Sequence, residues 1–192
     1  MALHKAARKF AKQGNIEFAR TALMTAEANV PEIEIEFLRD FAWSCLAETY
    51  DSIGDTAIAQ NCLNHIDGAD LKAWSFWHMW AARYTKGESS DVEELKSQAI
   101  EATKAADTFK RVAMWSEASE TVYRIWEKGL AEDYLGNAIA VVSGMQTRWL
   151  RGRALSRIAN SVIALQSASG GRRAIVPLSN DGSHRLGTLI SH

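Results

Sequence analysis

The chain has 192 residues and a mass of 21.2 kDa, which is enough for one domain or for a short array of repeats. Hydrophobic residues make up 47% of it and charged residues 23%, close to the globular average, which argues against wholly disordered, collagen-like and membrane-embedded chains. The 22 Lys and Arg residues nearly balance the 23 Asp and Glu residues, and this balance argues against a surface built entirely for nucleic acid.

The first ten residues, MALHKAARKF, carry charges where a secretory signal needs a continuous apolar stretch of about 7–15 residues. The longest apolar runs, such as residues 138–142, are far shorter than the roughly 18 residues needed to span a bilayer. We therefore expect a cytoplasmic protein without membrane contact.

The two cysteines, Cys45 and Cys62, are too few for a disulfide scaffold. They flank Gly54 and could face each other across a helical hairpin, but we interpret them as two small buried apolar side chains. Cys62 and His65 share a helix face, yet no further ligands follow at a recognisable metal-binding spacing. We expect neither a metal site nor a cofactor.

Apolar residues recur at helical spacing almost throughout residues 1–166, and no convincing strand pattern appears before residue 170. Turn residues separate these helical segments at Gly14-Asn15, residues 29–31, Gly54-Asp55, Asp67-Gly68, residues 87–90, Gly129 and Ser143-Gly144. The pattern predicts a chain of helix pairs, with the second helix of the third pair over residues 91–106.

Four tryptophans, Trp43, Trp77, Trp115 and Trp149, recur at a nearly constant interval. Their successive position numbers differ by 34, 38 and 34. A fixed period of this length indicates a repeat architecture, in which each helical hairpin buries its apolar face against its neighbours.

The residue types around Trp43 follow the order aromatic, large apolar, small, aromatic, Gly turn, Ala, large apolar. The residues are Trp43, Leu46, Ala47, Tyr50, Gly54-Asp55, Ala59 and Leu63, and residues 1–31 show the same order with Leu3, Ala6, Ala7, Phe10, Gly14-Asn15, Ala19, Leu23, Ala26 and Pro31. This order resembles the tetratricopeptide repeat. The resemblance implies an all-α superhelical array of about four αα-hairpins over residues 1–166, and HEAT or armadillo repeats stay open as an alternative.

The predicted last helix, over residues 146–166, has no partner helix in the sequence, so we expect it to cap the open end of the array. Ser and Gly then mark a linker, and residues 167–192 form a flexible or hairpin tail.

In proteins of the tetratricopeptide type the first helix of each pair lines a concave groove, and the resemblance carries this role onto matching positions here. The expected groove residues are His4, Arg8 and Lys12 in the first unit, Glu48 and Asp51 in the second, His78 and Lys86 in the third, and Glu120, Tyr123 and Arg124 in the fourth. Members that bind chaperone tails hold a peptide carboxylate with a particular set of Lys, Asn and Arg residues, which this chain lacks. Glu48 and Asp51 would also repel such an anion, so that ligand is disfavoured.

The densest aromatic stretch, residues 74–84, places Phe76, Trp77, Trp80 and Tyr84 on one broad helix face and His78 on another. A helix packed on two sides explains this pattern. Gripping of an apolar partner side chain is the alternative role, because exposed Trp and Tyr are common interface anchors.

Charge is distributed unevenly along the chain. Residues 32–107 hold 15 Asp and Glu against 6 Lys and Arg, net −9, whereas residues 140–192 hold 7 Arg against Asp181 alone, net +6. The expected basic patch comprises Arg148, Arg151, Arg153, Arg157, Arg172 and Arg173. Such a patch suits phosphates, an acidic protein surface or the acidic middle of another copy.

The sequence contains no phosphate loop, nucleophile elbow, His-Glu-x-x-His helix or dinucleotide fingerprint. We therefore expect a non-enzymatic protein-protein interaction module, adaptor-like or chaperone-like, that binds a peptide or helix in the groove. Two alternatives remain: a nucleic-acid-associated protein that uses the basic C-terminal helix and tail, and a self-associating structural subunit or homo-oligomer.

Overall fold

A computed structural model describes residues 2–87, 91–125 and 127–169, and within these ranges the chain is all-α. In chain order the elements are α1 (Ala2–Lys12), α2 (Ile16–Asn29), the 3-10 turn η1 (Val30–Glu32), α3 (Glu36–Ser52), α4 (Thr56–Asn64), α5 (Ala69–Lys86), α6 (Val92–Ala105), α7 (Thr108–Arg124), α8 (Lys128–Ser143) and α9 (Arg148–Ser169). The second helix predicted for the third pair, over residues 91–106, is α6 to within one residue at each end.

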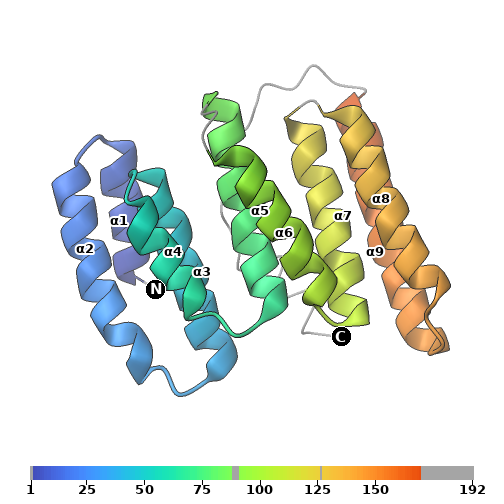
Figure 1. The fold of residues 1–192 in the computed structure, drawn as a ribbon, viewed down its shortest axis with the longest axis horizontal. Helices are drawn as coiled ribbons and strands as arrows, with labels where there is room; N and C mark the ends of the chain where they lie inside the picture. The colour runs from blue at the N-terminus through green and yellow to red at the C-terminus, as the bar shows by residue number, and fades with distance from the viewer. Residues whose placement is uncertain (1, 88–90, 126, 170–192) are drawn as a thin grey trace.

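Consecutive helices pack as antiparallel pairs, α1 with α2, α3 with α4, α5 with α6 and α7 with α8. The odd-numbered helices α1, α3, α5, α7 and α9 also contact one another in series, and we call them the first-helix layer. Figure 1 shows this layer behind a second layer of α2, α4, α6 and α8. The arrangement is compatible with a helical-repeat fold.

Glycines in left-handed backbone conformation follow three of the helices. Gly14 and Gly54 form the turns of the first two pairs with φ of 77° and 88°, and Gly87 ends α5 with φ of 71°. Because residues with a Cβ rarely adopt this conformation, these positions stop their helices where the sequence predicts turns.

Three of the four recurring tryptophans lie in the core. Trp43, Trp77 and Trp115 occupy the middle of α3, α5 and α7 and are at most 6% exposed. The fourth, Trp149, is 62% exposed because it is the second residue of α9, far from the helix middle where its counterparts pack. The interval between Trp115 and Trp149 therefore does not connect equivalent positions in two helices.

The aromatic stretch on α5 is packed on two sides, as predicted. Trp77 and Trp80 are almost fully buried, and the Trp77 indole donates a hydrogen bond to Thr103 Oγ1 on α6 at 3.1 Å. The Trp77 ring also contacts Tyr134 on α8, with centroids 5.0 Å apart. Only Tyr84, at the last turn, is exposed among the four residues predicted to share its face.

Helix α9 packs against both α7 and α8 at the end of the series, which is the position expected for the capping helix. It extends to Ser169, three residues beyond the predicted end of the helical domain. The flexible or hairpin tail predicted for the remainder falls outside the described residues from residue 170 onward. No described helix combines the length and apolar character that crossing a membrane requires.

Candidate functional site

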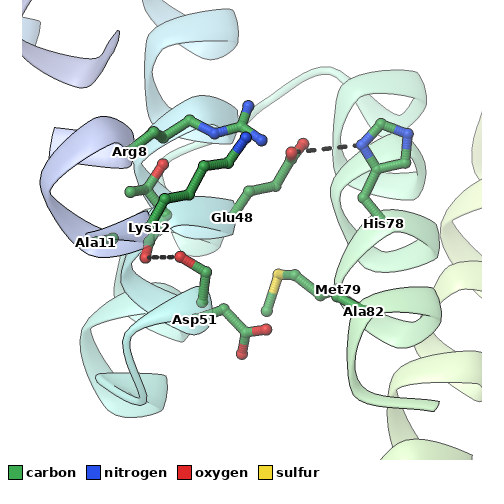
Figure 2. Close-up of a pocket in the computed structure, with 10 residues that line it drawn as sticks. Arg8, Ala11, Lys12, Glu48, Asp51, His78, Met79 and Ala82 are labelled. Carbon is green, nitrogen blue, oxygen red and sulfur yellow. Dashed lines mark hydrogen bonds and ion pairs between the residues drawn. The ribbon is translucent and has the colours of Figure 1, made fainter. Parts of the chain in front are cut away.

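A pocket of about 300 Å³ opens on the first-helix layer between α1, α3 and α5. Ten residues line it: Arg8, Ala11 and Lys12 from α1, Glu48, Thr49, Asp51 and Ser52 from α3, and His78, Met79 and Ala82 from α5. Figure 2 shows the charged side chains from α1 reaching over the pocket toward Glu48 and His78. Five of the ten predicted groove residues thus line one pocket.

Glu48 on α3 faces His78 on α5, and the Glu48 Oε2 atom lies 3.3 Å from His78 Nδ1. The histidine is 9% exposed. Burial alone would lower the pKa of His78, but the charge of Glu48 and its hydrogen bond, with a further contribution from Glu117, outweigh burial and raise that pKa above 6.5. When it is protonated, the imidazole forms a buried ion pair with Glu48.

Asp51, one turn further along α3, pairs with Arg83 of α5. The Arg83 Nε atom donates to Asp51 Oδ1 at 3.1 Å, Nη2 donates to the same oxygen, and the side chains of Arg83 and Asp51 are 9% and 3% exposed. Nearer the middle of the same helices, the hydroxyl groups of Ser44 and Ser75 lie 2.6 Å apart. Helices α3 and α5 are thus joined by three polar pairs in parallel register, at positions 44 and 75, 48 and 78, and 51 and 83.

These pairs change the electrostatics expected for the groove. Each carboxylate of the pocket has a basic partner on α5, while α1 adds the charges of Arg8 and Lys12. The repulsion of a bound anion, expected from Glu48 and Asp51 on the sequence alone, is therefore compensated in the folded chain. The pocket presents both charge signs beside the apolar side chains of Met79 and Ala82.

His4 lies near the pocket without lining it. Burial, followed by the charge of Arg8, lowers the pKa of His4 to about 4. Its Nδ1 atom is buried and has no hydrogen-bond partner among the described residues. His4 is therefore neutral at physiological pH.

A row of charged or titratable residues, one from each helix of the first-helix layer, runs through the pocket and continues beyond it to α7 and α9. The row runs Arg8 on α1, Glu48 on α3, His78 on α5, Glu117 on α7 and Arg157 on α9. Arg157 donates to Glu117 Oε2 at 2.9 Å, and Glu117 acts electrostatically on His78. Opposite charges adjoin at Arg8 and Glu48 and at Glu117 and Arg157, and His78, between the two glutamates, completes the alternation when it is protonated.

The groove residues predicted for the fourth unit lie apart from the pocket. Glu120 is 4% exposed and accepts a hydrogen bond from Ser161 of α9 at 2.7 Å, so it is an interhelical contact and not an open groove residue. Arg124 lies 3.4 Å from Glu120, and Tyr123 is half-buried. Lys86 is exposed at the end of α5. Of the residues predicted for the groove, those that share one pocket all come from the first three units, where His4 and Lys86 do not line it.

The predicted basic patch is also divided. Arg157 faces α7, as described above, and the Arg153 guanidinium lies 5.5 Å from the Phe109 ring centroid and 5.9 Å from that of Trp149. Arg148 and Arg151 remain exposed on α9. Arg172 and Arg173 lie outside the described residues, so the structure leaves two arginines of the patch on an open surface.

Sequence reasoning missed Arg83 and Glu117, which neutralise Asp51 and Arg157 respectively. Arg83 follows Asp51 by 32 positions and Arg157 follows Glu117 by 40, both close to the spacing of the helix pairs. A search of the sequence for residues of opposite charge at that spacing could have found both pairs.

Cys62 is buried and Cys45 is half-buried, and both are free thiols. Burial raises the pKa of each thiol to about 12. Neither group is ionised at physiological pH, which agrees with the interpretation of both as apolar side chains.

Comparison of the chain with protein-family models, with curated proteins and with solved structures finds no match.

Proposed function

We propose that this chain is a non-enzymatic protein-protein interaction module of the adaptor or chaperone-like kind, built from tetratricopeptide-like hairpins. It binds a peptide or a helix of a partner protein along the first-helix layer, centred on the pocket between α1, α3 and α5. The observation that carries this proposal is the pocket itself, which three hairpins form together. Stacked helical repeats typically use such a shared surface to hold extended ligands.

The size and chemistry of the pocket suit side chains of a partner. A volume of about 300 Å³ is at the lower end of the range for ligand sites, which favours one or two side chains over a large cofactor. Ala11, Met79 and Ala82 supply apolar contact, while Lys12 is an exposed cation at the rim. The buried pairs of Glu48 and Asp51 hold the walls in place, so little ordering is required on binding.

The proposal is tested by selecting peptides from a random display library on the immobilised full chain. Ala82→Trp places a large ring in the pocket at an exposed helical position, so we expect it to abolish capture of the selected peptides. Ala140→Trp is the matched control, because Ala140 is also exposed but lies on α8 in the other layer. Capture that survives Ala82→Trp unchanged, or a library that yields no peptide on the wild-type chain, would contradict the proposal.

A second pair of variants tests the role of the rim charge. Lys12→Glu reverses a cation that lines the pocket, whereas Lys9→Glu makes the same change on an exposed position of the same helix outside it. We expect Lys12→Glu to alter which peptides are selected and Lys9→Glu to leave the selection as in the wild type. Identical selections from all three chains would show that ligands bind elsewhere.

A further inference from the structure

An acidic and apolar surface lies where η1 leads into α3. We call it the acidic corner, and it consists of Glu32, Glu34, Ile35, Glu36 and Leu38, all of them exposed. Ile35 is 61% exposed and Leu38 46%, although both are large apolar side chains. Residues 32–38 hold three glutamates and no basic residue, and the next residue, Arg39, is half-buried. Apolar side chains ringed by charges of one sign are typical of a protein-binding surface.

A basic and apolar surface lies at the start of α9. We call it the basic end, and it consists of Arg148, Trp149, Arg151 and Leu155. Trp149 is 62% exposed and Leu155 50%, and the Trp149 ring lies against the Arg153 guanidinium, which restricts its orientation. Helix α9 contains no acidic residue at all. The two surfaces therefore match in apolar content and are opposite in charge.

The position of Arg148 is unfavourable within its own helix. It lies in the first turn of α9, where the unpaired backbone N–H groups already carry partial positive charge, and no acidic residue lies in that turn. A carboxylate from outside the chain would stabilise both the arginine and the helix end. The acidic corner presents three such carboxylates.

The two surfaces cannot meet within one molecule. Figure 1 shows the junction of α2 with α3 and the start of α9 at the same edge of the helix layers but at opposite ends of the series. Two copies placed end to end bring the basic end of one beside the acidic corner of the next. The pair then still has one free surface of each kind, the acidic corner of one copy and the basic end of the other, so the contact can continue from copy to copy.

We propose that the basic end of one copy of this chain binds the acidic corner of a second copy, through opposite charges around a centre formed by Trp149, Leu155, Ile35 and Leu38. This contact is independent of the pocket and of the function proposed for it. Because the two surfaces differ, the association is heterologous and yields assemblies that grow with protein concentration.

The experiment measures the mass of the full chain by sedimentation velocity over a range of concentrations. At about 0.01 M salt, where charges act over about 30 Å, we expect the average mass to rise above that of a dimer as concentration increases. At about 1 M salt, where the range falls to about 3 Å, we expect a smaller mass at each concentration. A monomer at every concentration in low salt overturns the proposal.

Charge-reversal variants identify the two surfaces. We expect Arg148→Glu with Arg151→Glu to weaken association by at least about tenfold, and Glu34→Arg with Glu36→Arg to do the same. Lys5→Glu with Lys9→Glu on α1 is the control, because both lysines are exposed and belong to neither surface. Association that persists in either test variant, or that is lost equally in the control, overturns the proposal.

Mixing the two test variants gives a readout that loss of folding cannot imitate. In each variant alone, the basic end and the acidic corner carry charge of the same sign and repel each other. In the mixture, the glutamates at positions 148 and 151 of one variant can contact the arginines at positions 34 and 36 of the other. We expect assemblies to form only in the mixture and to contain both variants. If the mixture stays monomeric, the two surfaces do not bind each other. The same conclusion follows if the wild-type chain stays monomeric while its Arg148 and Arg151 bind a DNA duplex.

Discussion

The carboxylate of Asp40 on α3 accepts hydrogen bonds from the backbone N–H groups of Gly68, at 2.8 Å, and of Asp67, at 3.1 Å, where α5 begins. Asp40 is only 3% exposed. A side chain of the second hairpin thus caps the first helix of the third, and this contact fixes the position of α5 relative to α3.

Replacing this cap is expected to destabilise the fold. Asp40→Ala leaves two N–H groups near the start of α5 without their acceptor, so we expect the free energy of unfolding to fall by about 1–3 kcal/mol in urea denaturation. Asp40→Asn keeps one oxygen acceptor and should lose less. Equal losses of stability in the two variants would show that Asp40 does not stabilise the fold by accepting these hydrogen bonds.

The Asp51 and Arg83 pair predicts a strongly non-additive mutant cycle. Arg83→Met leaves the Asp51 carboxylate buried beside an apolar side chain, and we expect a loss of about 3–5 kcal/mol in the free energy of unfolding. Adding Asp51→Leu removes the unpaired charge, so the double variant should be more stable than Arg83→Met alone. Urea denaturation of both single variants and the double variant measures the coupling, and additive losses would contradict it.

His78 predicts that part of the stability is lost as the pH rises. Because Glu48 raises its pKa in the folded state, the folded chain binds the proton more tightly than the unfolded chain. This stabilisation is fully present below pH 6.5 and disappears as the pH increases through the raised pKa. We expect the stability difference between wild type and His78→Gln to shrink over that range in urea denaturation, and a constant difference would contradict the ion pair.

His4 predicts the opposite pH dependence. Its pKa of about 4 lies below the unfolded value of 6.5, so the unfolded chain binds the proton more tightly between these two values. The stability of the wild-type chain should therefore fall as the pH decreases from 6.5 toward 4. His4→Gln should reduce this fall, as seen in urea midpoints across the same range, and an unchanged acid slope would show that His4 is protonated in the folded chain.

The helix pairs and the core positions of the first three recurring tryptophans follow from the sequence, because both depend on residues close together in the chain. A glycine that adopts positive φ ends a helix by local sterics, and an apolar residue at helical spacing faces the core of its own hairpin. The same logic failed for Trp149, because the period of the repeat does not specify where the last helix begins.

The pairing of charges was decided by the tertiary structure. Whether Arg153 and Arg157 belong to an open basic patch depends on how α9 is rotated against α7, and that rotation places Arg157 on Glu117 and Arg153 on Phe109. Likewise, the sequence alone does not show which residues pair with Glu48 and Asp51. In the fold both are paired, because the register of α3 against α5 places His78 and Arg83 opposite them. Packing of whole helices fixes such registers, and no residue encodes them alone.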